Sequence, residues 1–216
     1  MKILVTAFDP FGNDQVNPAL EAVKQLPQEI AGAQIITLEV PTIFNTSAAV
    51  VKEAVDNYRP DVLVNIGQAG GRAGITPERV AINIDDAAIC DNAGQQPIDQ
   101  IIQPDGAAAY FSTLPIKAIV AALKAADIPA TVSNTAGTFV CNHLMYQNLY
   151  LAQHEYPQMK AGFIHIPYMD EQLGTHQQQK PSLPLATLVK GLCIALEAIV
   201  TFDGRPDLQT IEGKIS

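Results

Sequence analysis

The sequence is poor in the residues that mark several large classes of protein. It has no tryptophan, and its three cysteines, at positions 90, 141 and 193, show no C-x-x-C spacing. An odd number of scattered thiols argues against both a disulfide framework and a structural zinc site. The remaining question about these thiols is whether one of them is a nucleophile.

Charged side chains and long apolar runs are also scarce. Only 16% of the residues are charged, and 13 basic against 22 acidic side chains give a net charge of −9. A basic surface for nucleic acid would have to form against the negative electrostatic field of the protein, so a general nucleic-acid-binding protein is not expected. No run approaches the roughly 18 apolar residues of a membrane span, and the Met-Lys start leads into a strand-like segment instead of a signal peptide. We therefore expect a cytoplasmic protein with no nucleic-acid or membrane partner.

The apolar pattern predicts an α/β fold. With 48% hydrophobic positions in 216 residues, the chain has enough material for a substantial core. Short β-branched runs alternate with longer amphipathic stretches, which indicates a three-layer domain with a twisted, mainly parallel central sheet flanked by helices. No linker or repeat divides the chain, so residues 1–216 are expected to form a single domain.

The elements follow from the same pattern. The expected strands are Lys2–Phe8, Gln34–Val40, Asp61–Gly67, Val80–Ile84, Ala130–Ser133 and Gly162–Pro167. The expected helices are Pro18–Leu26, Ser47–Tyr58, Asp105–Ala126, Asn142–His154 and Leu183–Phe202. Pro18 suits the first position of its helix, and Asn45 or Thr46 can cap the second helix.

Three irregular segments rich in glycine or proline each follow an expected strand. They are Asp9–Asn17, Gln68–Pro77 and Thr135–Val140. Ligands of open α/β sheets bind outside the carboxyl ends of the strands, so we expect these segments to meet around one crevice. A fourth, polar segment at Asp85–Gln103 is either an extended arm or a lid.

The segment from Gly67 to Gly74 carries four glycines, which makes it a candidate phosphate loop. It matches neither G-x-G-x-x-G nor the G-K-[ST] ending of a P-loop, so nucleotide binding is poorly supported. A tight turn that needs positive φ is favoured over an anion site. The loop also delivers Glu78, whose carboxylate can reach the same crevice.

Cys141 lies where a cysteine nucleophile is commonly found. It follows a strand and a turn and precedes a helical pattern that starts at Asn142. The positive end of a helix favours thiolate over thiol, although a buried structural cysteine fits the same placement equally well. Cys193 lies in an apolar helical run, where a thiol serves packing, and Cys90 in the polar segment is treated as incidental.

His165 stands near the carboxyl end of an expected strand that Pro167 terminates. A lone histidine on a strand is more often a satisfied core or edge residue, but the crevice segments emerge at this end of the sheet. An imidazole within reach of Cys141 would take the thiol proton and later pass it to a leaving amine. Glu78, accepting from the far ring nitrogen, would fix the tautomer of that imidazole.

A metal site is a rival explanation for the histidines, because His143, His154, His165 and His176 recur every eleven residues. The expected strand around His165 interrupts any shared helix face. His143 and His154 would lie roughly 16 Å apart along one helix, which is too far for one ion. We therefore expect no metal ion.

Apolar side chains also lie in or beside the crevice segments. Phe8, Phe11, Phe139 and Val140 can floor a small apolar pocket, with Asn17 supplying amide recognition. Aromatic residues next to strands join the core by default, and both roles are compatible.

Together these motifs resemble those of pyroglutamyl peptidase I, the pyrrolidone-carboxylate peptidase family of cysteine peptidases. The likeness extends over most of the chain, and the glutamate and cysteine motifs are long and specific. It is carried by Phe8-Asp9-Pro10-Phe11-Gly12 with Asn17-Pro18, by Gly67-Gln68-Ala69-Gly70-Gly71-Arg72, by Ile75-Thr76-Pro77-Glu78-Arg79-Val80-Ala81-Ile82-Asn83, by Asp91-Asn92, by Ala109-Tyr110-Phe111-Ser112-Thr113-Leu114-Pro115, by Val132-Ser133-Asn134-Thr135-Ala136-Gly137-Thr138-Phe139-Val140-Cys141-Asn142 and by Phe163-Ile164-His165-Ile166-Pro167.

The resemblance implies a catalytic triad of Cys141 as nucleophile, His165 as general acid and base, and Glu78 as orienting carboxylate. It implies hydrolysis of the N-terminal pyroglutamyl (5-oxoprolyl) residue from peptides and proteins through a thioester acyl-enzyme, without a cofactor. The backbone N–H of Cys141 is the expected oxyanion donor. The implied substrate-binding residues are Phe8, Phe11, Asn17, Gln68, Phe139 and Val140.

The resemblance also implies a phosphorylase/hydrolase-like sheet architecture and assembly into a homo-oligomer, a dimer or a tetramer. Two positions depart from the family pattern: Ala88 stands where many relatives have arginine, and Leu20 where they often have tryptophan. A pocket that closes over a neutral lactam would have to desolvate the ammonium group of an ordinary N-terminus, so free amino ends are expected to be rejected.

Two alternatives stand beside this interpretation. The first is a nucleoside phosphorylase or hydrolase, which rests on the sheet architecture and the glycine-rich segment and is a fold-level analogy. The second is a pyroglutamyl-binding homologue that has lost catalytic rate through Ala88.

Overall fold

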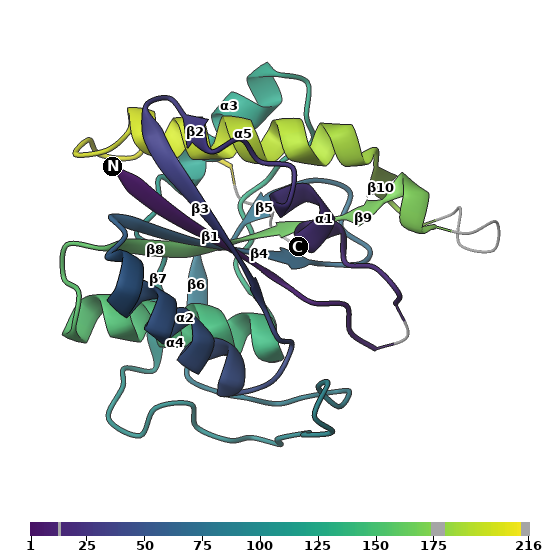
Figure 1. The fold of residues 1–216 in the computed structure, drawn as a ribbon, viewed down its shortest axis with the longest axis vertical. Coiled ribbons are helices and arrows are strands. Elements are labelled where there is room, and N and C mark those ends of the chain that lie inside the picture. Colours follow the sequence, from purple (N-terminus) through teal and green to yellow (C-terminus); the bar gives the residue numbers. More distant parts are fainter. Residues whose placement is uncertain (13, 174–179, 213–216) are drawn as a thin grey trace.

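A six-stranded, mostly parallel sheet forms the centre of the fold (Figure 1). The computed structural model describes residues 1–12, 14–173 and 180–212. The strands run in the order β2-β3-β1-β4-β8-β5; β3, β1, β4 and β8 are parallel, and the edge strands β2 and β5 are antiparallel to their neighbours. Their bounds are β1 Lys2–Phe8, β2 Glu29–Ile30, β3 Ala33–Val40, β4 Val62–Gln68, β5 Thr76–Pro77 and β8 Lys160–Ile166.

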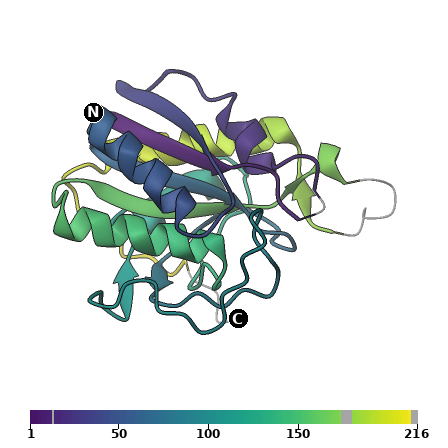
Figure 2. The ribbon, with the colours of Figure 1, turned by 60° about the horizontal axis from the view of Figure 1, so that its bottom comes forward.

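Helices cover both faces of the sheet, which confirms the predicted three-layer α/β architecture. Figure 1 shows α3 and α5 on one side and α2 and α4 on the other, and Figure 2 shows the same layers from a second direction. The helices are α1 Pro18–Val23, α2 Thr46–Tyr58, α3 Ile116–Ala125, α4 Val140–His154 and α5 Leu185–Thr201. Short elements complete the fold: β6 Val80–Ile82, β7 Ala109–Phe111, β9 Tyr168–Met169, η1 Asp170–Gln172 and β10 Ser182–Leu183.

The alternation of side chains along β1 builds two hydrophobic cores. Ile3, Val5 and Ala7 belong to the core that α1, α3 and α5 cover. Leu4 and Phe8 belong to the core beneath α2 and α4. Successive side chains of a strand point to opposite faces, and parallel strands that are covered on both faces read as nearly continuous apolar runs. This double coverage is why the strand pattern is so clear in the sequence.

Four of the predicted strands are confirmed to within two residues at either end: Lys2–Phe8, Gln34–Val40, Asp61–Gly67 and Gly162–Pro167. The Val80–Ile84 strand is shorter than predicted and lies outside the main sheet, because β6 pairs with β7 as a separate two-stranded sheet.

The predicted strand Ala130–Ser133 is wrong, since only isolated bridges join it to Ile75 and Glu78. Thr131 N–H donates to the Ile75 carbonyl and Ser133 N–H to the Pro77 carbonyl. Between these two bonds the ladder would need an N–H at position 77 to donate to the Thr131 carbonyl, and proline has no N–H. Pro77 therefore interrupts what would otherwise be a continuous parallel pairing.

The predicted helix Asp105–Ala126 is wrong in its first half. Residues Ala109–Phe111 form β7, and α3 begins only at Ile116, after Pro115 at the N-cap position. Proline disfavours helical geometry in the residue before it, so Leu114 cannot continue a helix into α3.

The two predicted helix starts differ in outcome. Pro18 does begin α1, and the Asn17 side chain accepts the capping bond from the Ala19 N–H at 3.0 Å. Asn45 occupies the N-cap position of α2 with a φ of 61°, but its side chain makes no capping bond. Its backbone N–H donates instead to Nε2 of His143 at 3.1 Å.

The Asp85–Gln103 segment is an extended arm that is fastened to the body at several points (Figure 2). Asp85 and Gln100 exchange backbone hydrogen bonds at its base. The Asp91 carboxylate accepts from the Phe44 N–H at 3.0 Å. Asn92 donates to Oδ1 of Asp9 at 3.1 Å and to the Pro10 carbonyl at 2.9 Å. The arm thus packs against the loop that follows β1.

The C-terminal stretch returns to α3 and caps it. The Asp207 carboxylate accepts from the Lys117 N–H at 3.0 Å and the Ala118 N–H at 2.9 Å. Asp207 thereby caps the free amides at the start of this helix, because Pro115 at the N-cap position has no polar side chain that could accept from them. Within the described ranges no helix is both long and apolar enough to cross a bilayer.

We expect Asp207→Ala to lower the free energy of unfolding by about 1–2 kcal/mol, the usual cost of removing a helix cap. Asp203→Ala is the matched control, because Asp203 forms an exposed ion pair with Lys160 and such pairs contribute about 0–1 kcal/mol. Urea denaturation of both variants measures the difference. An equal loss in the two variants would show that Asp207 does not cap α3.

Candidate active site

Glu78 and His165 form a buried, hydrogen-bonded pair at the carboxyl end of β8. Nδ1 of His165 lies 2.7 Å from Oε1 of Glu78, and the two side chains are 4% and 0% exposed. The short strand β5 pairs with β8 so that Thr76 lies opposite His165, and the Glu78 N–H then donates to the Phe163 carbonyl at 2.9 Å. Strand pairing therefore determines where the carboxylate meets the imidazole.

Close approach explains three of the four glycines between Gly67 and Gly74, including Gly74, where a Cβ would lie 2.2 Å from the Pro129 carbonyl oxygen. A Cβ at Gly67 would lie 2.7 Å from the Phe163 ring and 3.2 Å from Cδ2 of His165, and a Cβ at Gly70 would lie 2.3 Å from the Tyr168 hydroxyl. Only Gly71, with a φ of +91°, needs the positive φ that the sequence predicted for this turn. The lack of a side chain at Gly67 thus makes room on β4 for the Phe163 ring, and the His165 ring lies close beside it.

Opposing effects set the charge states of the pair. Burial by itself raises the pKa of Glu78, but the hydrogen bond and charge of His165 and the charge of Arg72 outweigh it, so this pKa lies below its ordinary value of 4.5. Burial lowers the pKa of His165 below 6.5, and Glu78 offsets only part of that effect. At neutral pH Glu78 is therefore a carboxylate and His165 a neutral imidazole. Its Nδ1 donates to Glu78, and its Nε2 is an acceptor.

Arg72 is a third member of this cluster, and the sequence analysis did not identify it. Its Nη1 donates to Oε1 of Glu78 at 2.6 Å and to Oγ1 of Thr76 at 2.5 Å, and its Nη2 donates to the Thr135 carbonyl at 3.1 Å. The available signal was a cation in the glycine-rich segment, six residues before Glu78. Sequence alone does not show that the loop turns this cation back toward the carboxylate.

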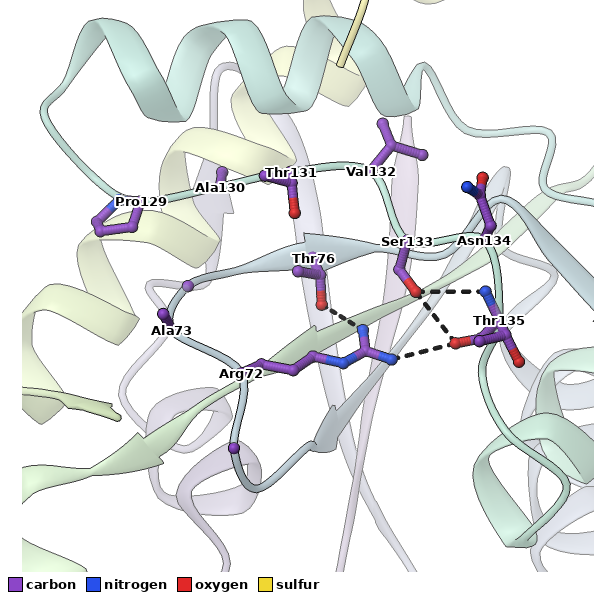
Figure 3. Close-up of a pocket in the computed structure, with 12 residues that line it drawn as sticks. Arg72, Ala73, Thr76, Pro129, Ala130, Thr131, Val132, Ser133, Asn134 and Thr135 are labelled. Atoms are coloured by element: carbon purple, nitrogen blue, oxygen red, sulfur yellow. Dashed lines mark hydrogen bonds between the residues drawn. The ribbon is translucent and has the colours of Figure 1, made fainter. Parts of the chain in front are cut away.

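Figure 3 shows Arg72 reaching across one side of a cavity of about 520 Å³. The cavity lies between the Gly71–Gly74 turn and the Pro129–Thr135 segment, and Arg72 is the one ionisable residue among the described residues that line it. The Pro129–Thr135 segment runs on toward Cys141. Arg72 therefore borders the Glu78 carboxylate on one side and this cavity on the other.

Cys141 is the second residue of α4, after Phe139 at the N-cap position and Val140 at the first helical position. It is a free, partly exposed cysteine. Burial raises the pKa of its thiol to about 12, and the negative charge of Glu78 adds to that rise. The backbone amide at the helix start does lower this pKa, in the direction that the sequence predicted, but burial and the charge of Glu78 outweigh it. Cys141 is a thiol at neutral pH.

The predicted apolar pocket residues divide into two groups. Phe8 and Val140 are buried in the core under α2 and α4. Phe11 and Phe139 are partly exposed and pack together with their ring centroids 6.2 Å apart. Phe44 meets Phe139 edge to face at 5.4 Å and supports it from behind. The exposed pair is thus held in place by buried apolar side chains.

The two predicted amide residues both have partners within the chain. Asn17 is buried, and its Nδ2 donates to the Asp9 carbonyl at 3.1 Å while its Oδ1 caps α1. Gln68, at the carboxyl end of β4, donates to Oδ2 of Asp14 at 2.9 Å and accepts from Nε2 of Gln172 at 3.0 Å. These contacts hold the loop after β1 and the η1 turn at the same end of the sheet.

The other cysteines lie in different surroundings. Cys193 packs on α5 against the core that α1, α3 and α5 share. Cys90 is exposed on the arm, where its thiol donates to Oε1 of Gln96 at 3.5 Å.

The two other histidines that the structure describes, His143 and His154, have hydrogen-bond partners away from the Glu78–His165 pair. His143 is buried against Asp85, with Nδ1 2.7 Å from Oδ2, and His154 lies on the surface beside Tyr150. His176 lies outside the described residues. Across the described part of the chain, no three His, Cys, Asp or Glu side chains gather in a group that could hold a metal ion.

Comparison with known proteins places these features in one family. The family model for pyroglutamyl peptidase, a cysteine-type peptidase family, matches residues 1–202. The pyrrolidone-carboxylate peptidase of Lactobacillus johnsonii is 58% identical over 213 residues, covering 99% of both chains. That of Lacticaseibacillus paracasei is 58% identical over 214 residues with the same coverage.

Solved structures agree with the sequence comparison. Pyroglutamyl peptidase I of Bacillus amyloliquefaciens superposes with a TM-score of 0.91 at 48% identity and covers 96% of this chain and 99% of its own. The pyrrolidone carboxyl peptidase of Thermococcus litoralis gives a TM-score of 0.92 at 36% identity, covering 97% and 98%. The chain with this buried Glu78–His165 pair and its helix-borne Cys141 belongs to the pyroglutamyl peptidase family of cysteine peptidases.

Proposed function

We propose that this peptidase removes the N-terminal pyroglutamyl residue from peptides and proteins through a triad of Cys141, His165 and Glu78. The observation that carries the proposal is the buried 2.7 Å bond between His165 and Glu78, in a chain of this family. A buried histidine that is oriented by a carboxylate and keeps one ring nitrogen available is typical of a catalytic base. The nucleoside phosphorylase or hydrolase alternative is not favoured, because the matched family and relatives are peptidases.

The first half of the reaction forms a thioester. Sγ of Cys141 attacks the carbonyl carbon of the pyroglutamyl residue while Nε2 of His165 takes the thiol proton, so a neutral pair reacts without a standing thiolate. The tetrahedral intermediate collapses as the C–N bond breaks, and the imidazolium gives its proton to the leaving amine. Glu78 stabilises that imidazolium and keeps the ring in the correct tautomer.

The second half releases the acid. A water molecule gives a proton to Nε2 of His165 and attacks the thioester carbon. The C–S bond then breaks, and the proton returns to Sγ of Cys141, so the free enzyme is restored with no other reactant.

The start of α4 supplies the oxyanion donor in this proposal. The first amides of a helix have no partner inside the helix, and a capping side chain commonly satisfies them. Phe139 at the N-cap position has no polar side chain, and in the described part of the chain no side chain accepts a hydrogen bond from the Cys141 N–H. The backbone N–H of Cys141 is therefore available to the developing negative charge.

Substrate recognition in this proposal combines apolar contact with amide groups. Phe11 and Phe139 would hold the lactam ring over the buried Phe8 and Val140. Asn17 spends one Nδ2 hydrogen on the Asp9 carbonyl, and its second hydrogen is the donor we assign to the lactam carbonyl. Gln68 would complete the polar side of the pocket, fixed by its bonds to neighbouring loops.

The wider organisation of the protein stays a prediction. We propose that residues 1–216 work as one peptidase domain and that the chain assembles into a dimer or a tetramer in the cytoplasm. Ile98 and Ile101 on the arm are 70% and 67% exposed, which supports a subunit contact at the arm.

Replacing the proposed nucleophile tests the mechanism. Cys141→Ala should lower kcat/KM on a pyroglutamyl amide with a chromogenic leaving group by on the order of 10⁶-fold, as removal of a triad nucleophile does. Cys193→Ala is the matched control and should keep wild-type activity, because that thiol only packs on α5. Turnover that survives in Cys141→Ala would overturn the mechanism, and a wild type that binds the amide without turnover would identify a weakened homologue.

The lactam pocket predicts strict rejection of a charged ring. A prolyl amide has the same five-membered ring with an ammonium group in place of the lactam, and no acidic side chain is among the residues assigned to the pocket. Desolvating that charge without a partner should lower kcat/KM by about 10³-fold or more relative to the pyroglutamyl amide. Steady-state assays of the two amides measure the ratio, and comparable rates would contradict the assigned pocket.

The neutral state of His165 predicts a loss of stability in acid. The folded protein keeps this imidazole neutral where the unfolded chain protonates it, so protons favour the unfolded state below pH 6.5. The stability advantage of the wild type over His165→Asn should therefore shrink as pH falls through 6.5, by at most about 1.4 kcal/mol per pH unit. Urea denaturation at pH 7.5 and 5.5 measures it, and a constant difference would mean that His165 is not held neutral.

A further inference from the structure

The glycine-rich segment after β4 contributes a cation to the active site. We propose that Arg72 is a positioning residue, which holds the Glu78 carboxylate against His165 and ties both to the segment that leads to Cys141. This inference rests on the proposed function, since it assigns a task to Arg72 within the same triad.

The contacts of Glu78 make Arg72 necessary. Oε1 of Glu78 accepts from Nη1 of Arg72 at 2.6 Å and from Nδ1 of His165 at 2.7 Å. Oε2 is buried and has no hydrogen-bond partner in the described part of the chain. A carboxylate charge that is withdrawn from water is costly unless it is paired and hydrogen-bonded. A neutral imidazole supplies one hydrogen bond but no charge, so Arg72 is the cation that compensates Glu78.

The guanidinium also limits how Glu78 can move. Nη1 is shared between Oε1 of Glu78 and the Thr76 hydroxyl, while Nη2 reaches the Thr135 carbonyl. Figure 3 shows the bonds of Arg72 to Thr76 and Thr135. A planar group with its donors in a rigid fork can hold these partners at one angle, which a lysine cannot do. Because Thr135 lies six residues before Cys141, the same side chain connects the carboxylate to the nucleophile segment.

This assignment gives the glycine-rich segment a physical purpose other than phosphate binding. The Arg72 N–H donates to the Ala69 carbonyl at 3.3 Å, and Gly71 adopts a φ of +91° in the turn between them. Such a backbone conformation is easy for glycine and strained for other residues. The turn reverses the chain after β4 and directs the Arg72 side chain back toward Glu78.

The charge of Arg72 has a defined electrostatic effect on the triad. The ionisable groups that act on His165 are Glu78 and Arg72, and those that act on Cys141 are the same two. Arg72 lowers the pKa of His165 and of the Cys141 thiol, and it helps to hold the pKa of Glu78 low. Removing the cation should therefore make His165 easier to protonate and leave less neutral base in mild acid.

A matched pair of variants tests the proposal. Arg72→Met should lower kcat/KM at pH 7 by about 10²-fold, the cost of a misplaced catalytic group, and move the acid limb of the pH profile to higher pH by roughly one unit. Arg79→Met is the control, because Arg79 donates to Asn134 in the neighbouring segment at 2.8 Å and has no bond to Glu78. It should keep the wild-type acid limb. Arg72→Lys should keep the acid limb as well, since it retains the charge, but lose part of kcat.

The cavity beside Arg72 allows a second test by chemical rescue. Arg72→Ala leaves a guanidinium-sized space that opens into the cavity of about 520 Å³. Millimolar guanidinium ion should therefore raise the activity of Arg72→Ala several-fold and return its acid limb toward that of the wild type. The same concentration should leave Arg79→Ala unchanged.

The outcomes separate this inference from the function on which it rests. A titration of the His165 ring protons by NMR should show a higher pKa in Arg72→Met than in the wild type and Arg79→Met, and melting temperatures check that all variants are folded. If Cys141→Ala keeps its activity, the proposed triad fails. If Cys141→Ala is inactive while Arg72→Met keeps the wild-type acid limb and His165 pKa, only the role of Arg72 is overturned.

Discussion

The Glu78 carboxylate is completely enclosed by the protein, and the rest of the site is arranged around the need to compensate its charge. An ionised carboxylate without partners inside a protein costs several kcal/mol, so the fold must bring donors to it. It does so from two directions, with His165 on β8 and Arg72 on the turn after β4. The result is an imidazole with one defined tautomer and a free nitrogen that can act as a base.

The parallel sheet makes this meeting possible. β4 and β8 are neighbours in the centre of the sheet, and their carboxyl ends open onto the same edge. β5 pairs with β8 as an antiparallel edge strand, which brings Glu78 next to His165. Gly67 on β4 leaves room for the Phe163 ring and lies close to the His165 ring. The positions of Glu78 and His165 therefore follow from strand order and from the pairing of β5 with β8.

The charge states favour a reaction between neutral groups. Local reasoning from the helix end predicts a thiolate at Cys141. In the structure, burial and the charge of Glu78 raise the pKa of this thiol to about 12. Burial also lowers the pKa of His165. In the proposed mechanism, the same enclosure that holds Glu78 and His165 together keeps Cys141 protonated until His165 removes its proton.

Much of this protein is determined by its sequence alone. The buried parallel strands are nearly continuous apolar runs, so the α/β class and four central strands were predictable, and the motifs around Glu78, Cys141 and His165 carry the family. What only the tertiary structure decides depends on partners distant in the chain: Pro77 breaks the pairing of Ala130–Ser133, β7 replaces the start of a predicted helix, and Arg72 turns back onto Glu78. Hydrogen bonds and burial between remote segments leave no periodic signal, which is why the sequence shows the residues of the site but not the electrostatics that govern them.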